Sequence, residues 1–132
     1  MSDAVASKKI IIIDDDKFLL DMYAMKFVDQ GFAVTPCPSA EEALSKLEGG
    51  ETPDIIVCDI VMQKMDGFTF LQTVKEKKLA SSAAFVLLSN LGQKEDIEKG
   101  MGLGADGYII KASATPSEVV AKVLDIVKNK KV

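Results

Sequence analysis

Three short and strongly apolar runs in the chain each lead directly into charged residues. Residues 10–13 precede three aspartates at 14–16, residues 55–58 precede Asp59, and residues 108–110 precede Lys111. Runs of this length, rich in β-branched side chains, are typical of strands buried on both faces of a parallel sheet. Because the functional groups of an open α/β sheet gather beyond the carboxyl ends of its strands, we expect these charged side chains to lie together.

Amphipathic segments with helix-capping residues separate the apolar runs. Asp16, Ser39 and Thr115 stand where N-caps are expected, and Pro36 is expected to stop the second strand. The predicted order is a strand at 8–14, a helix at 17–30, a strand at 32–35, a helix between 39 and 49, a strand at 54–58, a helix from about 66 to 78, a strand at 85–88, a helix at 93–103, a strand at 107–111 and a helix from 116. This alternation predicts one α/β domain whose parallel sheet is covered by helices on both faces.

The aspartates at the predicted sheet edge indicate a metal site. Asp14, Asp15 and Asp59 would repel one another and shift their pKa values unless a cation joined them. Hard carboxylate oxygens suit Mg²⁺, which keeps several waters and binds phosphoryl oxygens. The pattern therefore predicts metal-assisted phosphoryl chemistry.

Four motifs carry a resemblance to a known family. They are Ile13-Asp14-Asp15-Asp16, then Asp59-Ile60-Val61-Met62-Gln63-Lys64-Met65-Asp66-Gly67, then Leu87-Leu88-Ser89-Asn90, and Gly104-Ala105-Asp106-Gly107-Tyr108-Ile109-Ile110-Lys111. Through them, residues 8 to about 128 resemble the response-regulator receiver domain of two-component signalling, similar to the single-domain chemotaxis type. The resemblance implies a flavodoxin-like (βα)5 fold with five parallel strands in the order 2-1-3-4-5.

The resemblance also implies a phosphoacceptor site. Asp59 would accept a phosphoryl group from a sensor histidine kinase or a phosphotransfer protein. Mg²⁺ would be bound directly by Asp15, Asp59 and the backbone carbonyl of Val61, and through water by Asp14. Asp16 is interpreted as a helix cap rather than a ligand.

Three further roles follow from the same resemblance. Lys111 would contact the carboxylate of Asp59 and later a phosphoryl oxygen, and the Ser89 hydroxyl would donate to the phosphoryl group. Ser89 and Tyr108 would form the switch, although a tyrosine in a buried strand also fits a purely structural role. An unknown downstream protein would bind the face made by the fourth helix, fifth strand and fifth helix, with the chain a monomer or a phosphorylation-dependent dimer.

The chain departs from the family pattern at three positions. Gln63 replaces a usual proline, which loosens the loop after Asp59, and Asn90 replaces a smaller residue after Ser89. Ala112 follows Lys111 where the family usually has proline, often in cis. Because a cis bond at a non-proline residue costs about 2.5–4 kcal/mol, we expect a trans bond or a functionally strained exception.

Composition narrows the class of protein. The 132 residues carry a net charge of −4, with no arginine and no histidine. Direct nucleic-acid binding is therefore not expected, and a phosphohistidine donor must lie outside this chain. No signal-peptide pattern or membrane span is apparent, so a cytoplasmic location is expected. Residues 1–7 are expected to be disordered and 8–130 to form the receiver domain.

Three alternatives compete with this interpretation. A haloacid-dehalogenase-like phosphatase would use the Asp-x-Asp spacing with Asp14 as nucleophile, but Phe18 stands where that family has threonine or valine. A flavodoxin-like FMN binder needs a phosphate-cradling first loop, and three aspartates there repel phosphate. An interaction module that has lost phosphorylation is disfavoured by the intact set of Asp14, Asp15, Asp59, Ser89 and Lys111.

Overall fold

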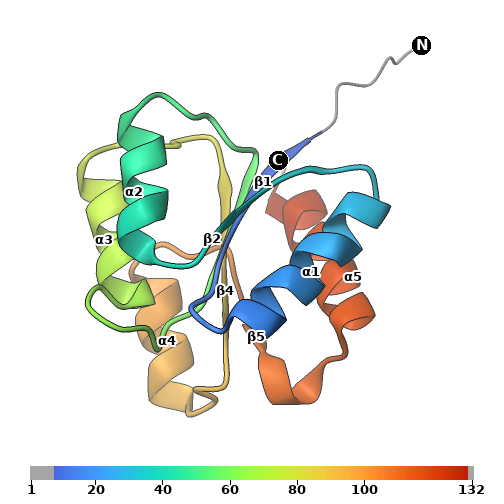
Figure 1. The fold of residues 1–132 in the computed structure, drawn as a ribbon. Helices are drawn as coiled ribbons and strands as arrows, with labels where there is room; N and C mark the ends of the chain where they lie inside the picture. The colour runs from blue at the N-terminus through green and yellow to red at the C-terminus, as the bar shows by residue number, and fades with distance from the viewer. Residues whose placement is uncertain (1–7, 131–132) are drawn as a thin grey trace.

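Strands and helices alternate throughout residues 8–130, the part of the chain that the computed structural model describes (Figure 1). The strands are β1 (Lys9–Ile13), β2 (Ala33–Cys37), β3 (Ile55–Cys58), β4 (Ala84–Ser89) and β5 (Gly107–Ile110). The helices are α1 (Lys17–Asp29), α2 (Ala40–Glu48), α3 (Gly67–Glu76), α4 (Lys94–Gly102) and α5 (Pro116–Lys130), with a short 3₁₀ turn at Lys111–Ser113. The expected disorder of residues 1–7 lies outside the described residues.

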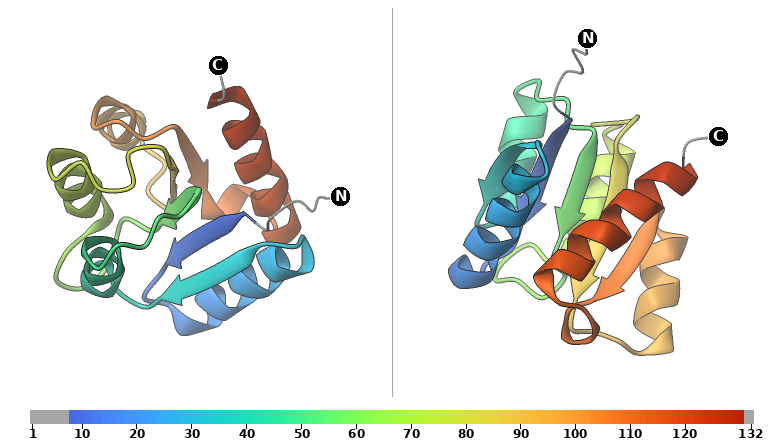
Figure 2. Two further views of the ribbon diagram at one scale, coloured as in Figure 1. Left: turned by 90° about the horizontal axis from the view of Figure 1, so that it is seen from above. Right: turned by 90° about the vertical axis from the view of Figure 1, so that its right-hand side faces the viewer.

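The five strands form one parallel sheet in the order β2-β1-β3-β4-β5, which confirms the predicted fold class. Helices α1 and α5 cover one face, and α2, α3 and α4 cover the other (Figures 1 and 2). The longest helix, α5, has 15 residues. Within residues 8–130 no helix combines the length and apolar character needed to cross a membrane.

The isoleucines of β1 explain why its sequence is continuously apolar. Ile10 and Ile12 pack in the cluster beneath α1 and α5, whereas Ile11 and Ile13 pack in the cluster beneath α2, α3 and α4. Successive side chains of a strand point to opposite faces, so a strand covered on both sides needs apolar residues at every position. The same reason applies to β3 and β4, whose residues are all buried.

The predicted caps are found at the helix starts. The Asp16 carboxylate accepts from the Leu19 N–H at 3.1 Å, and the Ser39 hydroxyl accepts from the Glu42 N–H at 3.1 Å. At α5 the capping is reciprocal, because Thr115 accepts from the Glu118 N–H and the Glu118 carboxylate accepts from the Thr115 N–H. These bonds satisfy backbone donors that have no partner within a helix and so set where each helix begins.

Four predicted strand ends differ from the observed ones, by one residue at β1, β4 and β5 and by two residues at β2. Strand β2 continues through Pro36 to Cys37. It is an edge strand, where a missing N–H breaks no interior ladder. Strand β5 ends at Ile110, and Lys111 opens the 3₁₀ turn instead of ending the strand. The Lys111–Ala112 bond is trans, as are the other peptide bonds described.

Gly67, the first residue of α3, is the basis of a stability prediction. A Cβ at this position would overlap the backbone of Asp59 and Ile60. We expect Gly67→Ala to lower the free energy of unfolding by about 1–3 kcal/mol, because backbone atoms cannot move aside as a flexible side chain can. Urea denaturation measures this difference.

Gly102→Ala is the matched control for Gly67→Ala. A Cβ at Gly102 meets no atom within 4 Å, and alanine favours the helix. This control variant should be at least as stable as the wild type. Equal stability of the two alanine variants would contradict the close packing of α3 on the residues that follow β3.

Candidate functional site

The aspartates that follow β1 and β3 come together at the carboxyl edge of the sheet, the lower edge in Figure 1. Ile13 and Cys58 are register partners, so the residues after them emerge side by side. Carboxylate oxygens of Asp14, Asp15 and Asp59 all lie within 4.8 Å of one another. Asp14 and Asp59 are buried, at 1% and 7% exposed, whereas Asp15 is exposed on the rim.

Lys111 reaches this cluster from the far side of β4. Its ammonium group lies 2.7 Å from Asp14 Oδ2 and 3.1 Å from Asp59 Oδ2, and its side chain is 9% exposed. The sequence predicted the contact with Asp59 but not the shorter contact with Asp14. The 3₁₀ turn at Lys111–Ser113 starts at this lysine, so Lys111 enters the cluster from a turn and not from a strand.

Burial and neighbouring charges shift the pKa values of the clustered side chains in opposite directions. Burial raises the pKa of Asp14 above its ordinary value, although the hydrogen bond from Lys111 works to lower it. Burial works to lower the pKa of Lys111, but the carboxylates of Asp14 and Asp59 outweigh it and the pKa is raised. Lys111 therefore stays protonated at neutral pH, and its one positive charge faces three carboxyl groups.

The donor set fits a hard divalent cation. One ammonium cannot neutralise three carboxylates, and Mg²⁺ prefers oxygen ligands with several retained waters. Asp14 uses both of its oxygens within the protein, because Oδ1 accepts from the Asp16 N–H at 2.9 Å and Oδ2 faces Lys111. Asp15 is exposed and so remains accessible to a cation from solvent.

Asp16 has a structural role at the start of α1. It caps α1 through the Leu19 N–H, which confirms the interpretation of this residue as a cap. Within residues 8–130, Asp14, Asp15 and Asp59 form a group of carboxylates close enough together to hold a metal ion, and Asp16 is not part of it.

Ser89 and Tyr108 are connected through the backbone of Leu91. Ser89 ends β4 with its side chain buried, and its Oγ accepts from the Leu91 N–H at 3.3 Å. The Tyr108 hydroxyl donates to the carbonyl of the same Leu91. Burial raises the pKa of Tyr108 to about 12, so this hydroxyl keeps its proton at neutral pH. The sequence predicted both side chains but not their link through the Leu91 backbone, because a backbone contact requires no particular side chain.

The loop between β3 and α3 is held from α2. The N–H of Met65 donates to Glu41 Oε2 at 3.1 Å, across 24 positions of sequence. Val61 projects into solvent from the same loop, with 61% of its surface exposed. Sequence reasoning missed Glu41, because one glutamate in the acidic first turn of a helix resembles ordinary helix stabilisation.

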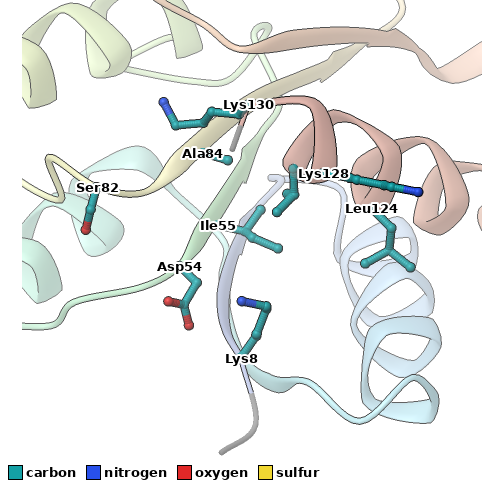
Figure 3. Close-up of a pocket in the computed structure, with 9 residues that line it drawn as sticks. Lys8, Asp54, Ile55, Ser82, Ala84, Leu124, Lys128 and Lys130 are labelled. Atoms are coloured by element: carbon teal, nitrogen blue, oxygen red, sulfur yellow. The ribbon is translucent and has the colours of Figure 1, made fainter. Parts of the chain in front are cut away.

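A separate pocket lies at the opposite, amino-terminal edge of the sheet (Figure 3). The Asp54 carboxylate in its lining accepts from the Lys9 N–H, and Lys130 is paired with Asp106. None of the sequence-predicted site residues lines this pocket, and its charged groups are partly engaged already. Its lining residues include Lys8, Asp54, Ile55, Ser82, Ala84, Leu124, Lys128 and Lys130.

Comparison with known proteins agrees with the geometry. Residues 10–124 match the family model of the response regulator receiver domain. The alkaline phosphatase synthesis transcriptional regulatory protein PhoP of Bacillus subtilis is 32% identical over 96% of this chain and 51% of its own length. An uncharacterized 14.6 kDa protein of Leptolyngbya boryana is 33% identical over 81% of each chain.

The solved structures agree with the family match. The receiver domain of the Francisella response regulator 1452 superposes with a TM-score of 0.82 at 27% identity, covering 95% of this chain and all of that domain. The chain spans about half the length of the first curated relatives it matches.

Proposed function

Because the chain belongs to the response regulator receiver domain family, we propose that it accepts a phosphoryl group on Asp59 in a Mg²⁺-dependent reaction. The observation that carries this proposal is the buried contact of Lys111 with both Asp59 and Asp14 beside the exposed Asp15. A carboxylate next to a fixed ammonium and a divalent-cation site has the surroundings that phosphoryl transfer requires. The chain is proposed to act in signalling and not as an enzyme with turnover.

The phosphoryl donor must lie outside these 132 residues, which contain no histidine. A phosphohistidine of a sensor histidine kinase or phosphotransfer protein would supply the group. A carboxylate oxygen of Asp59 would attack the phosphorus as the bond from phosphorus to the donor breaks. Lys111 would then contact a phosphoryl oxygen from its present position beside Asp59 Oδ2.

The proposed Mg²⁺ ligands are Asp15, Asp59 and the backbone carbonyl of Val61, with Asp14 acting through a bound water. Support for the indirect role of Asp14 comes from its deeper burial, at 1% exposed compared with 7% for Asp59, and from its short contact with Lys111. When bound, Mg²⁺ supplies positive charge that offsets the negative phosphoryl oxygens beside the aspartates.

Ser89 and Tyr108 are proposed to transmit phosphorylation to a partner surface. If the Ser89 hydroxyl turns toward the phosphoryl group, its bond with the Leu91 N–H is lost, and the Leu91 carbonyl moves with the hydroxyl of Tyr108. Tyr108 lies on β5, next to α4 and α5, so the proposed output surface is the α4–β5–α5 face. The partner is a downstream protein or a second, phosphorylated copy of this chain.

Asp14 is a poor candidate for the nucleophile of a phosphatase. It is buried at 1% exposed, compared with 7% for Asp59, and its Oδ2 lies closest to the Lys111 ammonium group, at 2.7 Å. Asp59 is the carboxylate at the end of β3 and carries the family motif. The phosphatase alternative therefore has no support in this geometry.

The direct test is the intact mass of the protein before and after incubation with acetyl phosphate. One added phosphoryl group is expected with Mg²⁺ or Mn²⁺ and none with EDTA. Full labelling in EDTA would mean that phosphorylation does not require a divalent cation. Absence of labelling under all conditions, with acetyl phosphate shown to be intact, would count against phosphoacceptor function.

Asp15→Ala is expected to raise the Mg²⁺ dissociation constant by about tenfold or more, on the order of 1.4 kcal/mol. The same change should modestly stabilise the metal-free fold, because it relieves repulsion with Asp14 and Asp59. Titration calorimetry and urea denaturation measure the two effects. Asp16→Asn is the control, since asparagine also caps a helix and the change removes a neighbouring charge. Metal affinity equal to that of the wild type in Asp15→Ala would exclude Asp15 as a ligand.

A further inference from the structure

The β3–α3 loop adopts its conformation without the rigidity of a proline. Gln63 is exposed, and Lys64 has a φ of 65°, in the left-handed region that non-glycine residues rarely occupy. Met62 and Met65 pack against the apolar cluster beneath α2 and α3, so the exposed Gln63 and Lys64 lie between two partly buried methionines. A strained conformation of this kind persists only where the surrounding structure holds it.

Glu41 provides such a hold from outside the loop. It lies in the first turn of α2, and its carboxylate accepts from the Met65 N–H at 3.1 Å in a partly buried setting. A hydrogen bond to an ionised acceptor is stronger than one between neutral groups. Glu41 also lines a hollow shared with Asp15, Gln63 and Lys64, so this contact lies next to the aspartate cluster.

We propose that Glu41 is a positioning residue that fixes the β3–α3 loop and thereby prepares the Val61 carbonyl for Mg²⁺. The inference rests on the proposed metal site and adds a residue from a helix that carries none of its ligands. A loop that is ordered before the cation arrives does not have to be ordered by the cation, so affinity rises. Glu41 also brings a negative charge, and the experiment must separate this charge from the hydrogen bond.

Three variants make that separation. Glu41→Ala removes the charge and the acceptor, whereas Glu41→Gln removes the charge and keeps an amide oxygen that can accept from the Met65 N–H. Glu42→Ala removes a charge from the adjacent, exposed position of α2. Urea denaturation of each variant shows whether the fold is retained before affinities are compared.

Two measurements test the role of Glu41. By titration calorimetry, Glu41→Ala should bind Mg²⁺ about three- to tenfold more weakly than Glu41→Gln, and Glu41→Gln should lie within about twofold of Glu42→Ala, given the modest net free energy of one hydrogen bond. In the metal-free protein, amide hydrogen exchange at Met65 should be about fivefold or more faster in Glu41→Ala than in Glu41→Gln.

Equal Mg²⁺ affinities of Glu41→Ala and Glu41→Gln, with normal binding by the wild type, would overturn the positioning role. Unchanged exchange at Met65 in Glu41→Ala would overturn it as well. A wild-type chain that binds no Mg²⁺ at all would overturn the proposed function itself. Mg²⁺ binding by the wild type therefore distinguishes a failure of the proposed function from a failure of the role of Glu41.

Discussion

Asp59→Asn is expected to take up no phosphoryl group from acetyl phosphate under conditions that label the wild type. The amide is a poor nucleophile, and it has nearly the same shape as the carboxylate it replaces. The backbone bond from the Asp59 N–H to the Ile13 carbonyl does not depend on the side chain and should keep the end of β3 in place. Intact mass measures the loss, and peptide mapping of the labelled wild type locates the group.

Asp66→Asn is the matched control for this variant. Asp66 is in the same loop and caps α3 by accepting from the Thr69 N–H at 2.8 Å. Asparagine caps a helix nearly as well, so this variant should fold and be labelled normally. Labelling of Asp59→Asn at the level of Asp66→Asn would mean that another carboxylate accepts the phosphoryl group.

The phosphorylated protein is expected to lose its phosphoryl group slowly. From the family resemblance we expect Val61 and Leu91 to border the path of the attacking water. Both side chains are apolar and cannot orient it. Because positioning supplies much of the catalysis of phosphoryl transfer, Val61→Asn and Leu91→Glu should speed decay, by up to about a hundredfold together. The decay rate of purified, labelled protein measures this effect.

Met101→Gln tests whether any polar substitution at an exposed apolar position has the same effect. Met101 is exposed on α4, away from the aspartate cluster, so its replacement should leave the decay rate unchanged. If neither Val61→Asn nor Leu91→Glu accelerates decay, another group orients the water. Asn90, exposed between Ser89 and Leu91, is then the residue to replace.

The sequence was sufficient to predict the sheet and the aspartates at its edge. A strand buried on both faces must be apolar at every position, and this requirement leaves a continuous run such as residues 10–13. The charged residue that ends the run then marks the carboxyl edge. The helix caps were equally predictable, because Asp16, Ser39 and Thr115 satisfy backbone donors through their own side chains.

What the sequence could not predict depends on local backbone geometry and on distant backbone atoms. Pro36 alone indicates the end of a strand, although proline is tolerated at the sheet edge where β2 lies. The contact of Lys111 with Asp14 depends on a 3₁₀ turn that replaces the end of β5. Glu41 accepts a hydrogen bond from a backbone N–H in a loop 24 residues away. Such a bond cannot be predicted from side-chain types, because any residue supplies the N–H.

The connection of Ser89 to Tyr108 through the main chain of Leu91 would make signal transmission and signal lifetime independently adjustable. The N–H and carbonyl of residue 91 link Ser89 and Tyr108, the two proposed switch side chains. The side chain of the same residue borders the proposed route of the attacking water. If both proposed roles hold, substitutions of the Leu91 side chain would lengthen or shorten the lifetime of a signal while its transmission is preserved, so response regulators matched to slow or fast stimuli could share one switch.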